Sequence, residues 1–284
     1  MNIADALQKS MDRIPGEGAA LDAHVLMGHV LGQPRSWVLA HPEVDLSPAQ
    51  QSDLEASLTR LALGEPLPYV LGHWEFYGLD FEVTPDVLIP RPETELLVDI
   101  ALAWLGRRPD SRSAVDVGTG SGCIAISLAA KIQNLRLVAT DLSSEALEVA
   151  RRNAQKYSVL DRVEFCCCDL LPPEGRVYDL IVANLPYIPT DTMKALPVYG
   201  REPTLALDGG QDGLEVVRRL IALAPECLSP GGMALLEIES GQGMAALSLA
   251  YDTFSHASLH LHRDLSGRDR LLEIQTHAGK DRLS

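Results

Sequence analysis

Glycines and two acids give the first indication of chemistry in this sequence. The loop Asp116–Gly122 has the sequence Asp-Val-Gly-Thr-Gly-Ser-Gly, and its glycines allow a tight turn that a ligand can approach closely. Asp141 follows a second apolar run, a position from which a carboxylate can accept two hydrogen bonds from a ribose diol. The loop and the acid together predict a site for a ribose-bearing cofactor.

The spacing of the glycines narrows the choice of cofactor. A dinucleotide site typically has the pattern G-x-G-x-x-G, whereas Gly118, Gly120 and Gly122 give G-x-G-x-G. Asp116 beside the loop would repel a pyrophosphate but attract the ammonium group of an amino-acid moiety. S-adenosylmethionine has that moiety and a ribose and carries no phosphate, so it is the expected cofactor. The alternative is that Asp116 only caps the local backbone.

A second motif, Asn184-Leu185-Pro186-Tyr187, follows an apolar run and could hold a methyl acceptor. The Asn184 side chain and the Leu185 carbonyl offer two acceptor oxygens, and Tyr187 offers a flat face, which together suit a planar –NH₂ group. Holding an amide nitrogen with its lone pair aimed at a sulfonium methyl is catalysis by positioning and needs no strong base. Asn-x-Pro is also typical of a simple turn, but its place after a cofactor loop favours an acceptor site.

Alternating strands and helices must bring these motifs together. Apolar runs predict strands at residues 114–117, 135–140, 163–167, 178–183 and 233–238, with helices at 121–131, 143–157 and 213–224. Two later runs, at 257–261 and 270–275, suggest a closing pair of strands. This rhythm predicts an α/β fold with a parallel doubly wound sheet, in which polar residues at the carboxyl ends of strands face a ligand crevice.

The segments before the sheet have a different composition. Residues 1–63 carry apolar side chains at helical spacing, and Ser47 followed by Pro48 is typical of a helix start. Residues 64–92 are rich in proline and glycine and contain a hairpin-like run with Gly78 at the turn. The predicted domains are therefore a helical domain at 1–63, a β-hairpin linker at 64–92 and a catalytic domain at 93–284.

Composition limits the class of protein. The chain of 284 residues is 46% hydrophobic and 22% charged, which is typical of a globular enzyme. Its net charge of −15 disfavours phosphate backbones, so no direct contact with nucleic acid is expected. No run approaches the roughly 18 apolar residues of a membrane span, and the first residues do not resemble a secretory signal. A cytoplasmic monomer that does not bind membranes is expected.

Neither the cysteines nor the histidines indicate a metal. The five cysteines, three of them consecutive at 166–168, form neither a disulfide framework nor a zinc pattern. His256, His260 and His262 could share a strand face, but no cysteine or patterned acid accompanies them. No metal cofactor is expected.

Several motifs closely resemble the release factor glutamine methyltransferases (the PrmC/HemK family). Besides the cofactor loop, they are Gly64–Gly72, Glu75–Gly78, Ile89–Glu95, Ala139–Asp141, Glu202-Pro203, Asp212–Leu214, Pro230–Gly232 and Gly267–Arg270. The resemblance covers nearly the whole chain. It implies a helical domain that contacts the release factor and a seven-stranded, Rossmann-like methyltransferase domain. It also implies that the protein uses S-adenosylmethionine, leaving S-adenosylhomocysteine, to methylate the side-chain amide of the glutamine in the Gly-Gly-Gln motif of peptide chain release factors, which tunes translation termination.

The resemblance also implies roles for particular residues. The expected cofactor-binding residues are Asp116, Gly118, Thr119, Gly120, Ser121, Gly122, Asp141, Leu170, which would border the adenine, and Asn184. The expected catalytic and substrate-binding residues are Asn184, Leu185, Pro186 and Tyr187, with Arg91 and Glu93 at the mouth of the pocket. Leu185 departs from the family's Asn-Pro-Pro-Tyr motif, but it keeps the carbonyl that the family uses, and Pro186 biases it towards an extended backbone.

Two other functions fit part of the pattern. Asn-Leu-Pro-Tyr also resembles the motif of RNA adenine dimethyltransferases, so the alternative is a nucleic-acid adenine amino methyltransferase. The acidic net charge and the lack of a basic tail with interspersed aromatic residues argue against it. A cofactor-binding protein without activity, in which Leu185 marks decay of the site, is disfavoured because the other residues needed for transfer are present.

Overall fold

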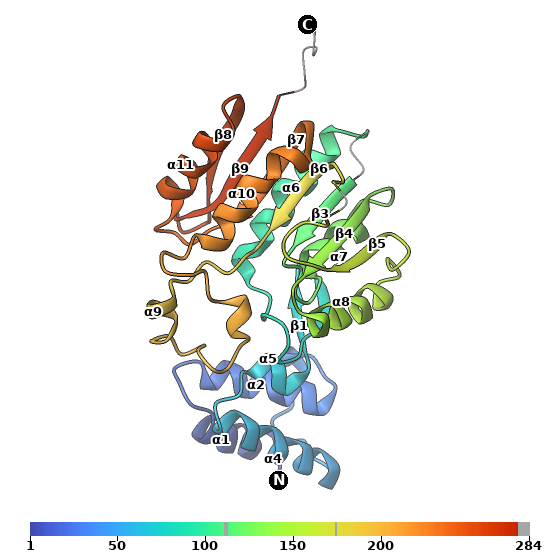
Figure 1. Ribbon diagram of the computed structural model, residues 1–284. Coiled ribbons are helices and arrows are strands. Elements are labelled where there is room, and N and C mark those ends of the chain that lie inside the picture. The colour runs from blue at the N-terminus through green and yellow to red at the C-terminus, as the bar shows by residue number, and fades with distance from the viewer. Residues whose placement is uncertain (111–112, 174, 278–284) are drawn as a thin grey trace, which may run out of the picture. The chain divides into compact units, whose positions relative to one another are not determined.

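The computed structural model describes residues 1–110, 113–173 and 175–277 and contains two compact units (Figure 1). The first unit is Met1–His73, and the second begins at Trp74. Among the helices in the described ranges, none is long and apolar enough to cross a membrane.

The first unit is built of helices. They are α1 (Ile3–Arg13), α2 (Ala19–Leu31), α3 (Arg35–Ala40), α4 (Pro48–Ala62) and α5 (Leu67–Leu71). Ser47 caps α4 as the sequence predicts, because its hydroxyl accepts the Gln50 N–H (3.3 Å) while the Gln50 side chain accepts the Ser47 N–H (2.9 Å). The α5 helix lies in the segment expected to be a linker; its two prolines occupy the N-cap and first turn, where a missing N–H costs nothing.

The second unit opens with a hairpin that is fastened to a helix of the same unit. Strand β1 (His73–Phe76) turns into β2 (Leu79–Glu82) through Tyr77 and Gly78, both of positive φ, as a two-residue hairpin turn requires. The Glu82 N–H donates to Asn153 Oδ1 (2.8 Å) and the Glu82 carbonyl accepts from Asn153 Nδ2 (3.0 Å), which ties β2 to α8 (Ser144–Lys156). From Trp74 onward, the hairpin is therefore part of the second unit.

A seven-stranded sheet forms the centre of the second unit. In spatial order its strands are β5 (Val163–Cys167), β4 (Arg136–Asp141), β3 (Ser113–Val117), β6 (Tyr178–Ala183), β7 (Leu228–Glu237), β9 (Asp269–Thr276) and β8 (Ala257–Arg263). The first five are parallel, which confirms that part of the prediction, but β9 is antiparallel to both β7 and β8. The loop from β8 to β9 is too short for a crossover, so these two strands can only form an antiparallel pair.

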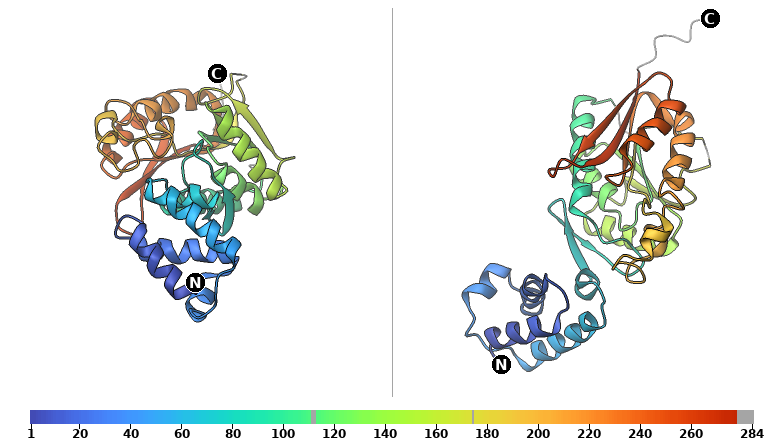
Figure 2. Two further views of the ribbon diagram at one scale, coloured as in Figure 1. Left: turned by 90° about the horizontal axis from the view of Figure 1, so that it is seen from below. Right: turned by 90° about the vertical axis from the view of Figure 1, so that its left-hand side faces the viewer.

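Helices cover both faces of this sheet. They are α6 (Glu95–Arg107), α7 (Cys123–Lys131), α8, α10 (Glu215–Cys227) and α11 (Gly243–Thr253), with α9 (Thr190–Met193) and the 3₁₀ turns η1 (Pro92–Thr94) and η2 (Thr204–Ala206) in the connections. Along β6, Leu180 and Val182 join the core under α6 and α7, whereas Ile181 and Ala183 join the core under α10 and α11. This alternation is the period of two expected for a strand buried on both faces, and the views of Figure 2 show the helices on the two sides.

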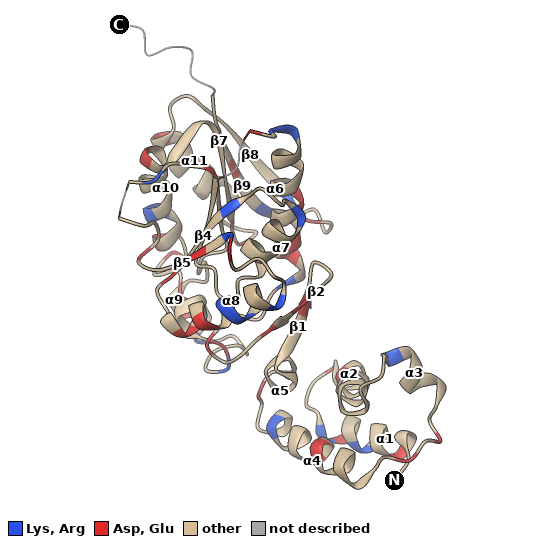
Figure 3. Cartoon of the chain, turned by 90° about the vertical axis from the view of Figure 1, so that its right-hand side faces the viewer, with Lys and Arg blue, Asp and Glu red and all other residues tan. Residues whose placement is uncertain are grey.

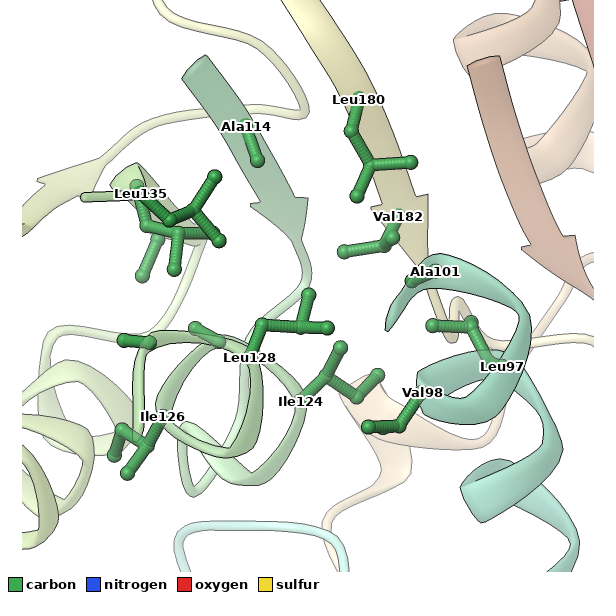
Figure 4. Close-up of a cluster of buried hydrophobic side chains, with 14 of the residues drawn as sticks. Leu97, Val98, Ala101, Ala114, Ile124, Ile126, Leu128, Leu135, Leu180 and Val182 are labelled. Atoms are coloured by element: carbon green, nitrogen blue, oxygen red, sulfur yellow. The ribbon is translucent and has the colours of Figure 1, made fainter. Parts of the chain in front are cut away.

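The first of these cores, under α6 and α7, fixes β3, α7 and β6 relative to one another. Figure 4 shows Leu180 and Val182 of β6 and Ala114 of β3 facing Ile124 and Leu128 of α7. These side chains are at most 4% exposed, so β3, α7 and β6 form one rigid block. The loops at the carboxyl ends of β3 and β6 start from this block.

Candidate active site

A cavity of about 360 Å³ lies at the carboxyl ends of β3, β4 and β6. It is lined by parts of the segments 85–94, 117–124, 140–146, 168–170, 184–186 and 203–206, with Val216 and Arg219 from α10. Its volume falls in the range of small-molecule sites, and its place is the crevice predicted for an open parallel sheet.

The structure requires glycine at each of the three glycine positions of the loop, for a different reason in each case. All have positive φ, at +72° for Gly118, +55° for Gly120 and +81° for Gly122. A Cβ at Gly118 would lie 3.0 Å from Leu185 Cδ2, and one at Gly122 would lie 2.8 Å from Ile126 Cδ1, whereas one at Gly120 would meet nothing within 4 Å. Gly118 thus lets the β6 loop approach, Gly122 lets the helix pack, and Gly120 lies open at the cavity, which Thr119 and Ser121 also line.

Asp116 lies behind this loop and is not among the residues that line the cavity. Its side chain is fully buried, and Oδ2 accepts hydrogen bonds from the Thr119 hydroxyl (2.7 Å) and the Ala125 N–H (3.1 Å). Oδ1 has no partner among the described residues. Burial raises the pKa of Asp116 to about 6, because the ionised form loses its hydration. In the structure Asp116 thus holds the loop and the start of α7.

Asp141 lines the cavity at the end of β4. Its two oxygens accept the N–H groups of Gly120 and Ser143, each at 2.9 Å, and burial raises its pKa. The Leu142 N–H also lowers this pKa, and because a carboxylate has about four acceptor positions, acceptor capacity remains for a diol. Leu170 also lines the cavity; its φ of +62° is unusual for a branched residue, and its carbonyl accepts the Thr140 hydroxyl at 2.6 Å.

Asn184, Leu185 and Pro186 line the cavity together, next to the glycine loop. Asn184 Nδ2 donates to the Thr94 hydroxyl oxygen at 3.0 Å, which leaves Oδ1 as the amide's acceptor. The Leu185 side chain is buried against Gly118. These residues therefore bring an amide with an acceptor oxygen and an apolar side chain to one wall of the cavity.

Tyr187 is not among the residues that line the cavity; it anchors the loop from behind. Its hydroxyl donates to Glu237 Oε1 at 3.3 Å, and its carbonyl accepts from Gln242 Nε2 at 2.8 Å. Burial and the nearby charge of Glu237 raise the pKa of Tyr187, so the phenol stays protonated. The loop is also held closely by Gly213, where a Cβ would collide with the Tyr187 carbonyl oxygen.

Arg91 and Glu93 have different places in the structure. Arg91 lines the cavity and forms an ion pair of 2.5 Å with the buried Glu202, whose second oxygen accepts the Ile89 N–H at 3.2 Å. Glu202 thus joins the two segments at the rim of the cavity. Glu93 does not line the cavity, but its charge raises the pKa of Tyr187 and of Glu237.

Sequence reasoning assigns no role to four residues that support the site. Thr94 and Glu202 lie in motifs of the resemblance, whereas Glu237 and Gln242 are in none of them. The lone acid Glu237 within an apolar strand was an available signal, because a buried carboxylate needs a reason. Gln242 carried no signal, since its partner is a backbone carbonyl far away in the sequence.

No group of three or more His, Cys, Asp or Glu side chains in the described part of the chain could hold a metal ion. His262 is instead hydrogen-bonded to Glu273 at 2.8 Å.

Comparisons with known proteins agree on one group. Residues 5–72 match the family model "PrmC N-terminal domain", and residues 114–198 match "Methyltransferase domain". The chain is 42% identical to a "Release factor glutamine methyltransferase" of Moorella thermoacetica, covering 95% of this chain and 97% of that protein. It is 38% identical to the protein of the same name from Cereibacter sphaeroides, covering 98% of this chain and 100% of that one.

Similarity to solved structures concerns the fold. The hMettl16 catalytic domain, solved in complex with MAT2A 3'UTR hairpin 6, aligns with a TM-score of 0.55 at 16% identity, over 82% of this chain and 84% of that one. The shared architecture is that of S-adenosylmethionine-dependent methyltransferases.

Proposed function

The chain belongs to the release factor glutamine methyltransferase family, and on that premise we propose that it methylates the side-chain amide of a glutamine in a peptide chain release factor. The glutamine is that of the release factor's Gly-Gly-Gln motif, and S-adenosylmethionine is the methyl donor. The single observation that carries the proposal is the orientation of Asn184. Its Nδ2 donates to Thr94, which leaves Oδ1 as the acceptor of a residue that lines the cavity, as an incoming –NH₂ group requires.

The loop of residues 184–187, here called the acceptor loop, acts by positioning the glutamine side-chain amide. Asn184 Oδ1 and the Leu185 carbonyl each accept one N–H of the glutamine, which directs the nitrogen lone pair out of the amide plane. Amide nitrogen is a weak nucleophile, so this alignment supplies much of the rate. Transfer breaks the bond between sulfur and methyl and leaves S-adenosylhomocysteine, and the methylated nitrogen releases one proton to water. The product keeps one N–H, so one of the two hydrogen bonds is lost after transfer, which weakens product binding.

The residues of the cavity fit S-adenosylmethionine. When bound, the cofactor supplies an electrophilic methyl group on a sulfonium. Asp141 keeps acceptor positions for the ribose hydroxyls, Gly120 offers open backbone to the methionine moiety, and Leu170 offers an apolar edge to the adenine. Asp116 serves the same site through Thr119 and the start of α7.

Leu185 is compatible with this role. Its carbonyl is the group that the mechanism uses, and its side chain is already buried beside Gly118. A proline at this position would present the same carbonyl with a smaller side chain. The substitution of leucine for the family's proline therefore keeps the second acceptor.

The helical unit Met1–His73 recognises the release factor in this proposal. It holds no part of the cavity, and residues 5–72 match the PrmC N-terminal domain. Its contribution is affinity for the intact protein substrate.

The charge distribution favours a protein substrate over a nucleic acid. In Figure 3 basic residues are interspersed with acidic ones. In the second unit, ion pairs join Arg152 to Glu82 and Lys156 to Asp80. Basic side chains held by acids are less available to phosphates.

Mass spectrometry of the methylated product tests the function. Purified protein and S-adenosylmethionine are incubated with intact release factor, with the same factor carrying Gly-Gly-Asn, and with an adenine-containing RNA hairpin. One methyl group on the glutamine of the first substrate alone is expected, and Asn184→Ala should slow it about a hundredfold, as loss of a positioning contact does. Methylation of the RNA with none of the release factor would replace the proposal by the adenine methyltransferase alternative.

A further inference from the structure

The carboxyl group of Glu237 lies in the interior beside the acceptor loop. Glu237 ends β7, and the neighbouring β6 leads directly into Asn184. The Glu237 side chain is fully buried; its Oε1 accepts from the Tyr187 hydroxyl at 3.3 Å, while its Oε2 has no hydrogen-bond partner among the described residues. The Thr94 hydroxyl lies close enough to this carboxyl group to lower its pKa. A buried carboxyl group lowers the stability of the fold unless it is paired or hydrogen-bonded. Its presence at the end of an apolar strand therefore suggests a role in function.

The Thr94 hydroxyl connects Glu237 to the acceptor loop. A hydroxyl has one hydrogen to donate and lone pairs that accept. Asn184 Nδ2 donates to the Thr94 oxygen at 3.0 Å, so the hydroxyl hydrogen is left to donate elsewhere, and Glu237 Oε2 is a nearby buried acceptor without a partner among the described residues. Thr94 is itself only 2% exposed, so water does not compete for this contact.

We infer that Glu237 is a positioning residue which, through the Thr94 hydroxyl, fixes the Asn184 amide with its oxygen toward the acceptor. This deepens the proposed function and rests on it for the direction in which Asn184 must face. With Glu237 neutral, Thr94 can turn its hydrogen to the Asn184 oxygen. The amide then rotates and presents its –NH₂ to the glutamine –NH₂, and two donors cannot bond.

The protonation of Glu237 sets how the network is oriented. Burial raises the pKa of Glu237 to about 7, while hydrogen bonding by Thr94 lowers it, and the charges of Glu93 and Arg270 act in opposite directions. Tyr187 stays protonated beside it, and the pKa of Cys123, on α7, is raised to about 12 chiefly by burial. Glu237 is thus the group of this cluster that changes charge near neutrality, and the oriented form gains population as pH rises.

Single-turnover methylation at saturating S-adenosylmethionine tests this with three variants. Thr94→Val, which has the same shape and no hydroxyl, should lower the rate at least about tenfold, and Thr94→Ser should restore it. The affinity for S-adenosylmethionine, measured by calorimetry, should stay unchanged in all variants. The rate of the unchanged protein should rise with pH about a midpoint near 7, and that of Glu237→Gln should not follow pH there.

Thr276→Val is the matched control. It also removes a hydroxyl that bonds backbone carbonyls, those of Ser229 and Gly232, but it lies outside the cavity. It should leave the methylation rate and its pH profile unchanged. A rate in Thr94→Val equal to that in Thr276→Val would overturn the inference.

A readout that does not depend on the substrate separates this inference from the proposed function. The chain has four asparagines, so selective ¹⁵N labelling gives four side-chain amide pairs, and the Asn184 pair is the one missing in Asn184→Ala. Its resonance should titrate near pH 7 in the unchanged protein and lose that titration in Glu237→Gln. If no release factor is methylated but the titration is seen, the proposed function is wrong and the inference about Glu237 is supported. If the Asn184 signal does not change with pH, the inference about Glu237 is wrong and the proposed function is unaffected.

Discussion

Asp141 is the residue on which cofactor affinity is expected to depend most. Its carboxylate lines the cavity and is already oriented by the Gly120 and Ser143 N–H groups. Asp141→Ala should weaken S-adenosylmethionine binding by about 1.5–3 kcal/mol, the range for hydrogen bonds to charged groups. Asp141→Asn, which keeps one acceptor oxygen, should lose less. Calorimetry on the three proteins checks the order, and equal affinities would place the ribose elsewhere.

The buried Asp116 makes stability depend on pH in a defined direction. Its pKa is about 6 in the folded chain against an ordinary value of 3.8, so the folded state holds the proton over that interval while the unfolded state has lost it. Stability contributed by the neutral form is therefore lost as pH rises through this window. Relative to Asp116→Asn, the free energy of unfolding of the unchanged protein should fall by up to about 3 kcal/mol between acid pH and neutrality.

Urea unfolding of both proteins below and above this window measures that difference. Comparing the two proteins at each pH cancels the contribution of the other acids. A free-energy difference that is the same at both pH values would mean that Asp116 is hydrated in the folded protein.

At the scale of elements, the acceptor loop depends on a neighbouring glycine. Gly213, just before α10, has φ +74°, and a Cβ there would meet the Tyr187 carbonyl oxygen. Gly213→Ala should therefore displace the loop 184–187 and abolish most methylation while cofactor binding remains. Gly267→Ala is the control, because Gly267 has φ +76° and open space around it, so it adds similar backbone strain without a collision.

Methylation rate, calorimetry and melting temperature together check this pair. Both variants should melt lower than the unchanged protein, and Gly213→Ala should melt lower than Gly267→Ala because of the added collision. If Gly213→Ala methylates as fast as Gly267→Ala, the loop is not held from this side.

The elements that carry the site could be predicted from local sequence. The helix start at Ser143 is confirmed, with its hydroxyl accepting the Ala146 N–H, and so is the strand Tyr178–Ala183, because both signals lie within a few residues. Gly118 and Asp141 were placed at one cavity because parallel strands end at the same edge.

What could not be predicted depends on contacts between distant segments. Thr94, Asn184 and Glu237 meet only in the folded sheet, so no spacing along the chain indicates that they lie close together. The sequence also does not decide which way the Asp116 side chain points, because an acid beside a glycine loop can face either the ligand or the helix behind the loop. The position of β9 inside the sheet also follows from packing rather than from periodicity.

For the whole molecule, recognition and chemistry should be separable. The cavity is built from residues of the second unit alone, so a protein beginning at Trp74 should bind S-adenosylmethionine and methylate a short Gly-Gly-Gln peptide. It should methylate intact release factor much more slowly than the full chain, because the helical contacts are missing. Cofactor binding reports that the shortened protein is folded, and equal rates on the intact factor would refute the division of labour.

The strand order has a consequence for how the protein is made. β9 is the last described strand in the chain, yet it fills the space between β7 and β8. During synthesis, which proceeds from the N-terminus, β7 therefore leaves the ribosome with one edge unpaired and keeps it so until Thr276 has emerged. A nascent chain stalled before Asp269 would carry an exposed apolar strand edge although all residues that line the cavity are already made, so its dependence on chaperones should fall once β9 pairs with β7.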